Sequence, residues 1–318
     1  MKKYFRLKNF SISFFAPVLG FAGFSLALQK AEELFNLPSW ISIGVLGFTI
    51  SIFIIVLGIY FLKFLFFKKE IAKEYNHPIK INFFPLISKV LLVLSVVFLS
   101  LDLTISKWLL VIGIVLNTIL SIHILGEWIS KEHFKIHHIS PAWFIPVVGN
   151  LIIPISGVIH FPAEISWFFF SAGVTWMLIL TTIVINRIIF HEPLAKKLMP
   201  TLFILFAAPA IAFIAYYKLT GSFDAFAHIL YYFAAFLFVL IFSQWKMFSK
   251  IEFYLSWWAY TFPLAAFFLS TVLMFHITEI LLFKWLSLAV LIVLSIFILV
   301  LIGKTARAIG RKELCVEE

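Results

Sequence analysis

Residues 201–219 read TLFILFAAPAIAFIAYYKL, an apolar run with Pro209 near its centre and small residues on both sides. About 20 apolar residues are enough for a helix to cross the ~30 Å hydrocarbon core of a bilayer. Proline lacks a backbone N–H and clashes with the preceding turn, at a cost of roughly 3 kcal/mol inside a helix. Within a bilayer the freed carbonyl needs a partner in protein or water. The stretch therefore predicts a transmembrane helix that packs against other helices or a cavity.

Segments of this kind occupy almost the whole chain of 318 residues. The composition is 63% hydrophobic and 13% charged, with a mean hydropathy of +1.08, which excludes an ordinary soluble domain. The spans are too long and too uniformly apolar for the strands of a membrane barrel, so we predict an all-α polytopic membrane protein with one transmembrane domain over residues 1–318. Its ten helices are expected at 10–28, 40–66, 82–101, 107–128, 143–160, 165–189, 200–219, 223–246, 254–275 and 277–303.

Prolines mark every second span. Six of the twelve prolines lie in the interior of predicted spans, and all six fall on odd-numbered ones, while the even spans contain none. This alternation predicts five kinked odd helices in an inner ring around a pore and five straight even helices outside them. The six residues are Pro17, Pro85, Pro146, Pro154, Pro209 and Pro263.

The proline spacing also indicates an internal repeat. Five of these prolines, one in each odd span, are separated by 68, 61, 63 and 54 residues. A period near 60 residues corresponds to one helical hairpin, which predicts five consecutive hairpins. All five enter from the same side, so they are parallel repeats, whereas a transporter built from inverted halves would alternate in direction.

The basic residues are distributed unequally between the two ends of the spans. Of the Lys and Arg residues that give the chain a net charge of +10, 20 fall on one side and 4 on the other, and Lys89 lies within a span. This bias places both short terminal tails in the cytoplasm. It explains the positive charge as a topology signal, so we do not expect nucleic acid as a partner.

The first apolar segment has two interpretations. MKKYFRLK followed by an apolar run resembles a signal peptide with a cleavage site after Ser25-Leu26-Ala27. Pro17, Gly20 and Gly23, however, repeat the pattern of the other odd spans. We therefore interpret the segment as a retained helix.

The sequence shows no constellation typical of an enzyme. It lacks a Gly-rich phosphate loop, a His-Glu zinc helix and a Ser/His/Asp set at comparable depth. His133, His137 and His138 could meet a metal if their loop were helical, but a solvated basic loop is the favoured interpretation. The single Cys315 excludes an intramolecular disulfide framework. We predict neither catalysis nor a cofactor.

Small residues accompany the prolines of the odd spans. Gly20 follows Pro17, Gly149 follows Pro146, and Thr261 lies two residues before Pro263. Close helix packing would also use small residues, but their placement on alternate helices favours a lumen that they line.

Phe262 interrupts one of these small-residue stretches directly before Pro263. A bulky ring at this position could occlude a narrow path. The chain has 40 phenylalanines, so ordinary packing is the alternative for any one of them.

Lys89 is the basic residue placed well inside a predicted span. Charges within a membrane usually face an interior or a water-filled cavity. Lys89 could instead snorkel to the headgroups, because it lies only ~10 Å into its helix. Both alternatives remain open. No acidic residue lies in the middle of a predicted span, which argues against a cation pump and favours a path for anions beneath a basic rim.

Four segments carry a family resemblance. They are EYNHPIK at 74–80, SPAWFIP at 140–146, Ala208-Pro209-Ala210 with Ala215-Tyr216, and WAYTFP at 258–263. In their order and spacing the chain resembles the tellurite-resistance/C4-dicarboxylate transporter family (TehA), which includes the slow anion channels of plant guard cells.

The resemblance implies a homotrimer with one pore inside the five inner helices of each protomer. The resemblance also implies that Phe262 plugs this pore and that the lining is mostly uncharged. We expect the protein in a cell membrane, the bacterial inner membrane. Two features depart from the family pattern: Lys89 is not expected in the lining, and the proline of the third span is shifted. The long regulatory tails of the plant channels are missing from this sequence.

Two functions are compatible with these observations. The favoured one is a passive, gated anion-selective channel for small inorganic anions such as chloride and nitrate, with the lipid bilayer as its other partner. The alternative is a proton-coupled carrier for a C4-dicarboxylate or another organic or tellurite-related anion. Such a carrier needs a titrating side chain, and the nearest candidates, His123 and His228, lie on even helices.

Overall fold

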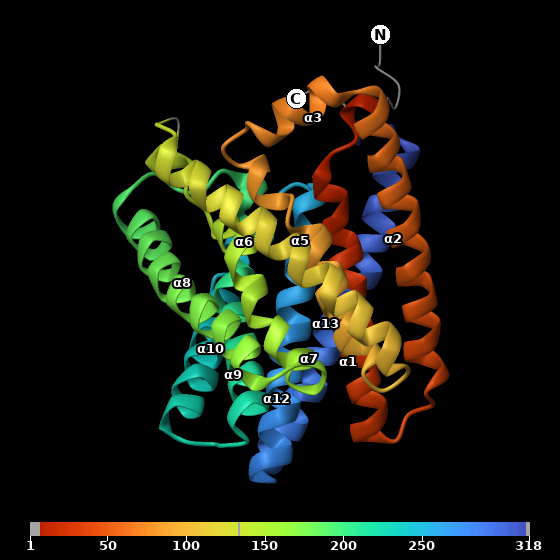
Figure 1. Ribbon diagram of the computed structural model, residues 1–318, viewed down its shortest axis with the longest axis vertical. Helices are drawn as coiled ribbons and strands as arrows, with labels where there is room; N and C mark the ends of the chain where they lie inside the picture. The colour runs from red at the N-terminus through yellow and green to blue at the C-terminus, as the bar shows by residue number, and fades with distance from the viewer. Residues whose placement is uncertain (1–6, 133, 316–318) are drawn as a thin grey trace.

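The computed structural model describes residues 7–132 and 134–315, which form one helical bundle (Figure 1). No strand occurs within these two ranges. Ten helical segments among them are long and apolar enough to cross a membrane, so the predicted all-α fold with ten spans is confirmed. The first and last described residues, Leu7 and Cys315, lie at the same end of the bundle, as an even number of spans requires (Figure 1).

Each odd span joins 3₁₀-helix to α-helix. The 3₁₀ segment comes first, on the side of the bundle that holds the chain ends, and the α-helix continues from it. The five spans are η2 (Ile12–Phe14) with α1 (Phe15–Phe35); η3 (Lys80–Phe83) with α4 (Leu86–Phe98); η5 (Pro141–Trp143), α6 (Phe144–Val148), η6 (Gly149–Leu151) and α7 (Ile153–His160); η7 (Lys196–Phe203) with α9 (Ile204–Thr220); and η8 (Leu255–Tyr260) with α12 (Thr261–Thr278).

Each even span is a single uninterrupted α-helix. These are α2 (Trp40–Phe66), α5 (Leu103–Ser130), α8 (Ala163–Phe190), α10 (Ala225–Ser243) and α13 (Leu281–Gly310). The shorter elements outside the spans are η1 (Leu7–Asn9), α3 (Lys68–Tyr75), η4 (Ile136–His138) and α11 (Trp245–Phe248). α3 lies at the end of the bundle that holds the chain ends (Figure 1).

The prolines act differently from the interior kinks that the sequence suggested. Pro17, Pro146 and Pro263 are each the third residue of an α-helix, and Pro85 is the N-cap of α4. In the first turn the N–H that proline lacks has no α-helical partner to lose, so the interior cost does not apply there. Of the six predicted kinks, Pro209 is inside an α-helix. The other five mark the point where a 3₁₀ segment passes into α-helix, including Pro154 at the start of α7.

The odd spans contain two further prolines. The fifth span begins at Pro141, which lay outside its predicted range, and the seventh begins at Lys196, so Pro200 lies inside this span and not at its first residue. The alternation is therefore stronger than the predicted boundaries indicated.

Burial divides the spans into two sets. In the odd spans 61–83% of the residues in the most apolar stretch are buried, against 22–33% in the even spans. The even helices expose apolar side chains such as Ile55, Ile119 and Phe236. An apolar exposed surface suits contact with lipid, and the odd spans lie inside it.

The first span is longer than predicted and brings a carboxylate with it. α1 continues to Phe35, so Glu32 belongs to the span, near its end. Glu32 is buried and accepts a hydrogen bond of 2.6 Å from the backbone N–H of Ser42, in the first turn of α2. It thereby caps the next helix, which explains a buried carboxylate at this depth.

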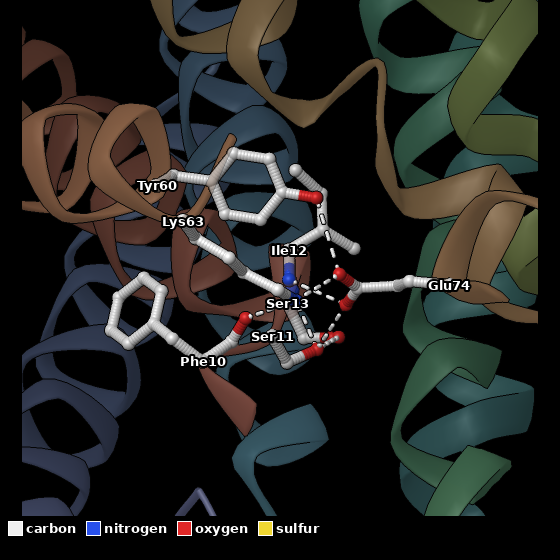
Figure 2. A network of polar contacts seen from close by, with 7 residues as sticks. All are labelled: Phe10, Ser11, Ile12, Ser13, Tyr60, Lys63 and Glu74. Carbon is white, nitrogen blue, oxygen red and sulfur yellow. Dashed lines mark hydrogen bonds and ion pairs between the residues drawn. The ribbon is translucent and has the colours of Figure 1, made fainter. Parts of the chain in front are cut away.

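A second buried carboxylate fixes the entry of the first span (Figure 2). Glu74 of α3 forms an ion pair of 2.8 Å with Lys63, and both side chains are less than 8% exposed. Lys63 also donates to the carbonyl of Phe10 at 2.7 Å. Three further donors reach the Glu74 carboxylate: the N–H of Ile12 at 2.8 Å, the Ser11 hydroxyl at 3.0 Å and the Tyr60 hydroxyl at 3.1 Å. The network ties α2, α3 and the start of η2 together.

The two ends of the chain meet beside this network. The side-chain amide of Asn9 donates to the carbonyl of Cys315 at 3.1 Å. Cys315 is buried, and burial raises the pKa of its thiol to about 11. The thiol is therefore protonated and unreactive at neutral pH.

Candidate functional site

A cavity of about 70 Å³ lies where the five odd spans meet. Each odd span contributes to its wall, for example Leu19 of α1, Lys89 of α4, Gly149 of η6, Ile211 of α9 and Phe262 of α12. Within the described ranges no even span contributes. The volume is suited to a small ion or a few water molecules, so the cavity is the candidate site.

The ring of Phe262 borders this cavity from the second position of α12. The side chain is half-buried and packs on the first span, where a Cβ placed on Gly23 would lie 3.1 Å from its Cδ2. A single added methyl group at Gly23 would therefore press on the ring. The contact shows that a glycine of α1 provides the space that Phe262 occupies.

Gly20 has a matching packing role one turn earlier. A Cβ at this position would overlap the Thr261 hydroxyl and touch the Trp258 ring at 3.1 Å. Thr261 is fully buried and donates to the carbonyl of Trp258 at 2.7 Å. Gly20 and Thr261 thus join α1 to α12, and neither borders the cavity.

Lys89 lies at mid-depth in the bundle. It is the tenth of 19 residues in the span Lys80–Phe98, and its side chain is 3% exposed. Its ammonium donates to the side-chain oxygen of Asn117, on α5. The Asn117 amide in turn donates to the side-chain oxygen of Asn150 at 2.7 Å. These contacts hold the ammonium away from both ends of its helix, unlike a snorkelling side chain.

Gly149 makes room for this lysine. A Cβ added there would overlap the side-chain carbons and the nitrogen of Lys89. Gly149 lies at the junction of α6 and η6, so the break in the fifth span and the absence of a side chain together admit the ammonium. Both residues border the cavity.

The structure brings together some of the predicted site residues and separates others. Lys89, Gly149, Phe262 and Pro263 border the cavity. The other six lie at junctions or helix contacts away from it: Pro17, Gly20, Pro85, Pro146, Pro209 and Thr261. The rest of the wall is mainly aliphatic and aromatic, with Ile145, Ile204 and Trp258 as examples that the proline pattern does not mark.

The sequence interpretation singled out neither Asn117 nor Asn150. Asn117 lies on an even span, which the division into inner and outer helices set aside. An amide in the middle of an otherwise apolar helix was the available signal, because polar groups within a membrane need partners.

The histidines considered as titrating or metal-binding residues lie elsewhere. His123 and His228 are exposed and do not border the cavity. His123 stacks on Tyr75, with ring centroids 5.4 Å apart, and burial raises the pKa of that tyrosine to about 12. His133 lies outside the described residues. Across the remainder, no group of three His, Cys, Asp or Glu side chains is placed to hold a metal.

The ten spans and the cavity between the odd ones define a multi-pass membrane protein of the channel or transporter class. A family model described as voltage-dependent anion channel (SLAC1) matches residues 9–306, and the chain belongs to this family. The family contains anion channels and transporters rather than enzymes, and the predicted resemblance is confirmed.

Three relatives show the range of the similarity. S-type anion channel SLAH3 of Arabidopsis thaliana is 32% identical over 280 residues, which cover 85% of this chain and 44% of SLAH3. The uncharacterized transporter MJ0762 of Methanocaldococcus jannaschii is 27% identical over 85% of this chain and 86% of its own length. The tellurite resistance protein TehA homolog of Haemophilus influenzae is 24% identical over 83% and 80%. The chain spans about half the length of plant relatives such as SLAH3.

Proposed function

We propose that this protein is a passive, gated channel for small inorganic anions, with chloride and nitrate as representative substrates. One observation carries the proposal. Among the described residues that border the central cavity, the charged side chain is Lys89, and no carboxylate accompanies it. A fixed positive charge in a low-dielectric wall attracts anions and repels cations much more strongly than it would in water. The names of the S-type anion channels to which the chain is similar support the same substrate class.

We propose Phe262 as the gate of this path. The cavity is small, and the ring forms part of its wall beside Pro263. The ring packs on Gly23 of α1 and borders the cavity, which leaves it space to change its rotamer. Rotation of one aromatic side chain is a small motion that changes the width of a narrow path substantially.

The rival proposal is a proton-coupled carrier for an organic anion. A carrier of this type needs a titrating group next to its substrate, and neither His123 nor His228 borders the cavity. This observation favours the channel.

We further propose a homotrimer in which each protomer has its own pore, in a bacterial inner membrane with both termini in the cytoplasm. The excess of Lys and Arg at the end of the bundle that holds the termini supports this orientation. The exposed apolar surfaces of the even helices support contact with lipid and with neighbouring protomers.

The test is electrical recording from purified protein in planar bilayers under a tenfold KCl gradient. A selective anion channel should reverse near the chloride equilibrium potential, about 59 mV from zero for a tenfold gradient of a monovalent ion. Discrete unitary steps would separate a channel from a carrier. Reversal at the potassium equilibrium potential would refute anion selectivity, and a smooth pH-driven current without unitary steps would favour the carrier.

A further inference from the structure

Lys89 is a buried lysine without a carboxylate partner in the described ranges. In the described ranges the ion pairs join Lys30 to Glu33, Lys63 to Glu74, Lys73 to Glu70 and Arg311 to Glu313, and none includes Lys89. An ammonium at the middle of a membrane span is costly unless an opposite charge or several acceptors compensate it. Lys63, the comparable buried lysine, has both a carboxylate and a backbone carbonyl. Lys89 has neither kind of partner among the described residues.

The hydrogen bonds of Lys89 show what is missing. An ammonium group has three N–H donors and no acceptor. The structure gives the Lys89 ammonium one protein acceptor, the side-chain oxygen of Asn117. The side chain also borders the central cavity, so that space is where further acceptors can reach it.

The surroundings are arranged around the lysine. Asn117 is itself fixed by donating to Asn150 at 2.7 Å, which orients its oxygen toward Lys89. Gly149 is the residue whose lack of a side chain leaves space for the ammonium. Asn117 and Asn150 are both nine-tenths or more buried. Three spans thus combine to hold one positive charge at the edge of a cavity.

We propose that Lys89, held in position by Asn117, binds one small monovalent anion in the central cavity, and that this anion is the missing counter-charge of the lysine. The site rests on the proposed channel function and specifies where along the path an anion pauses. A permeant ion must bind well enough to enter and weakly enough to leave. One ammonium in a cavity whose wall is otherwise mostly apolar meets both requirements, because it supplies the charge without enclosing the anion in a polar cage.

The decisive variant is Asn117→Asp. It replaces the amide that faces Lys89 by a carboxylate of nearly the same shape, so the lysine gains a permanent internal counter-charge. The amide of Asn150 can turn its NH₂ group toward the new carboxylate. A bound anion then becomes unnecessary and is repelled. Lys89→Met removes the charge directly, and Gly149→Ala displaces the lysine while keeping its charge.

The measurement is the thermal unfolding temperature of the purified full-length protein in detergent, at constant ionic strength, as sodium gluconate is replaced by sodium chloride. A ligand that binds only the folded state raises this temperature in a concentration-dependent way. The wild type should show saturable stabilisation by chloride. In Asn117→Asp and Lys89→Met the apparent affinity should fall at least about tenfold, or about 1.4 kcal/mol. Gly149→Ala should weaken binding in the same direction.

Lys197→Met is the matched control, because it removes one exposed positive charge at the end of the bundle and should leave the chloride dependence unchanged. If Asn117→Asp and Lys89→Met respond to chloride as the wild type does, Lys89 is a structural tie and the site is refuted. The same result follows if the wild type shows no dependence on chloride. Asn117→Asp is nearly isosteric, so it remains informative even if Lys89→Met does not fold.

The site and the channel can fail separately. If chloride stabilises the wild type, the two variants abolish this effect and no anion current is found in bilayers, the site is supported and the channel is refuted. If Phe262→Ala conducts anions, Asn117→Asp does not change this current and chloride does not stabilise the wild type, the channel is supported and the site is refuted.

Discussion

Replacing Phe262 by alanine tests the proposed gate most directly. The ring borders a cavity of only about 70 Å³, so removing its six ring carbons widens the path where it is already narrow. We expect the conductance of Phe262→Ala in bilayers to exceed that of the wild type at least about tenfold. A tenfold change corresponds to a barrier lower by about 1.4 kcal/mol, a modest demand for the removal of an occluding ring.

The stability cost of this change follows from the packing of the ring. Truncating a fully buried phenylalanine typically costs ~3–5 kcal/mol. Phe262 is half-buried and faces a cavity on one side, so about 2 kcal/mol is expected for Phe262→Ala. Anion-over-cation selectivity should change little, because Lys89 remains in place.

Two phenylalanines on the same helix serve as controls. Phe268 is 0% exposed and does not border the cavity, so Phe268→Ala should destabilise the protein more without raising conductance. Phe275 is half-buried like Phe262 and also lies away from the cavity, which matches the exposure of the test residue. Both variants are recorded under the same salt gradient, and their unfolding is followed in detergent.

The reasoning fails in either of two cases. If Phe262→Ala conducts no better than the wild type, the ring is not the occluding group. If Phe268→Ala or Phe275→Ala raises conductance equally, the effect comes from general loosening of α12 rather than from the cavity.

Two further predictions concern the buried ion pair and the path. Glu74→Gln should destabilise the protein by about 3–5 kcal/mol in denaturant unfolding, because it leaves Lys63 buried without its counter-charge. The control Glu70→Gln breaks an exposed ion pair and should cost at most about 1 kcal/mol. Equal costs for the two variants would mean that the network in Figure 2 contributes little to stability. In a Phe262→Ala background, Ile145→Cys at the cavity wall should react with a small aqueous thiol reagent, whereas Ile119→Cys on the exposed apolar face of α5 should not. Labelling rates are measured by mass spectrometry, and equal rates would contradict an inner path.

Much of the fold follows from local properties of the sequence. Apolar length determines that each of the ten segments spans a membrane, because a backbone in lipid must satisfy its own hydrogen bonds as a helix. The restriction of prolines to alternate spans anticipated which helices are buried, since a missing N–H is tolerated where protein rather than lipid surrounds the helix. What proline does there was harder to predict. Whether Pro17 or Pro263 bends a helix or begins one depends on where the 3₁₀ segment ends.

The sequence by itself thus determined the class of protein, the number of spans and the ring at Phe262 as a candidate, because these depend on hydrophobic length, proline placement and short motifs. Tertiary structure alone decided the surroundings of Lys89. Asn117 and Gly149 lie 28 and 60 residues from it along the chain, on different helices, and no periodicity connects them. The rotation of each helix about its own axis decides which side chains meet, and packing among all ten spans sets that rotation.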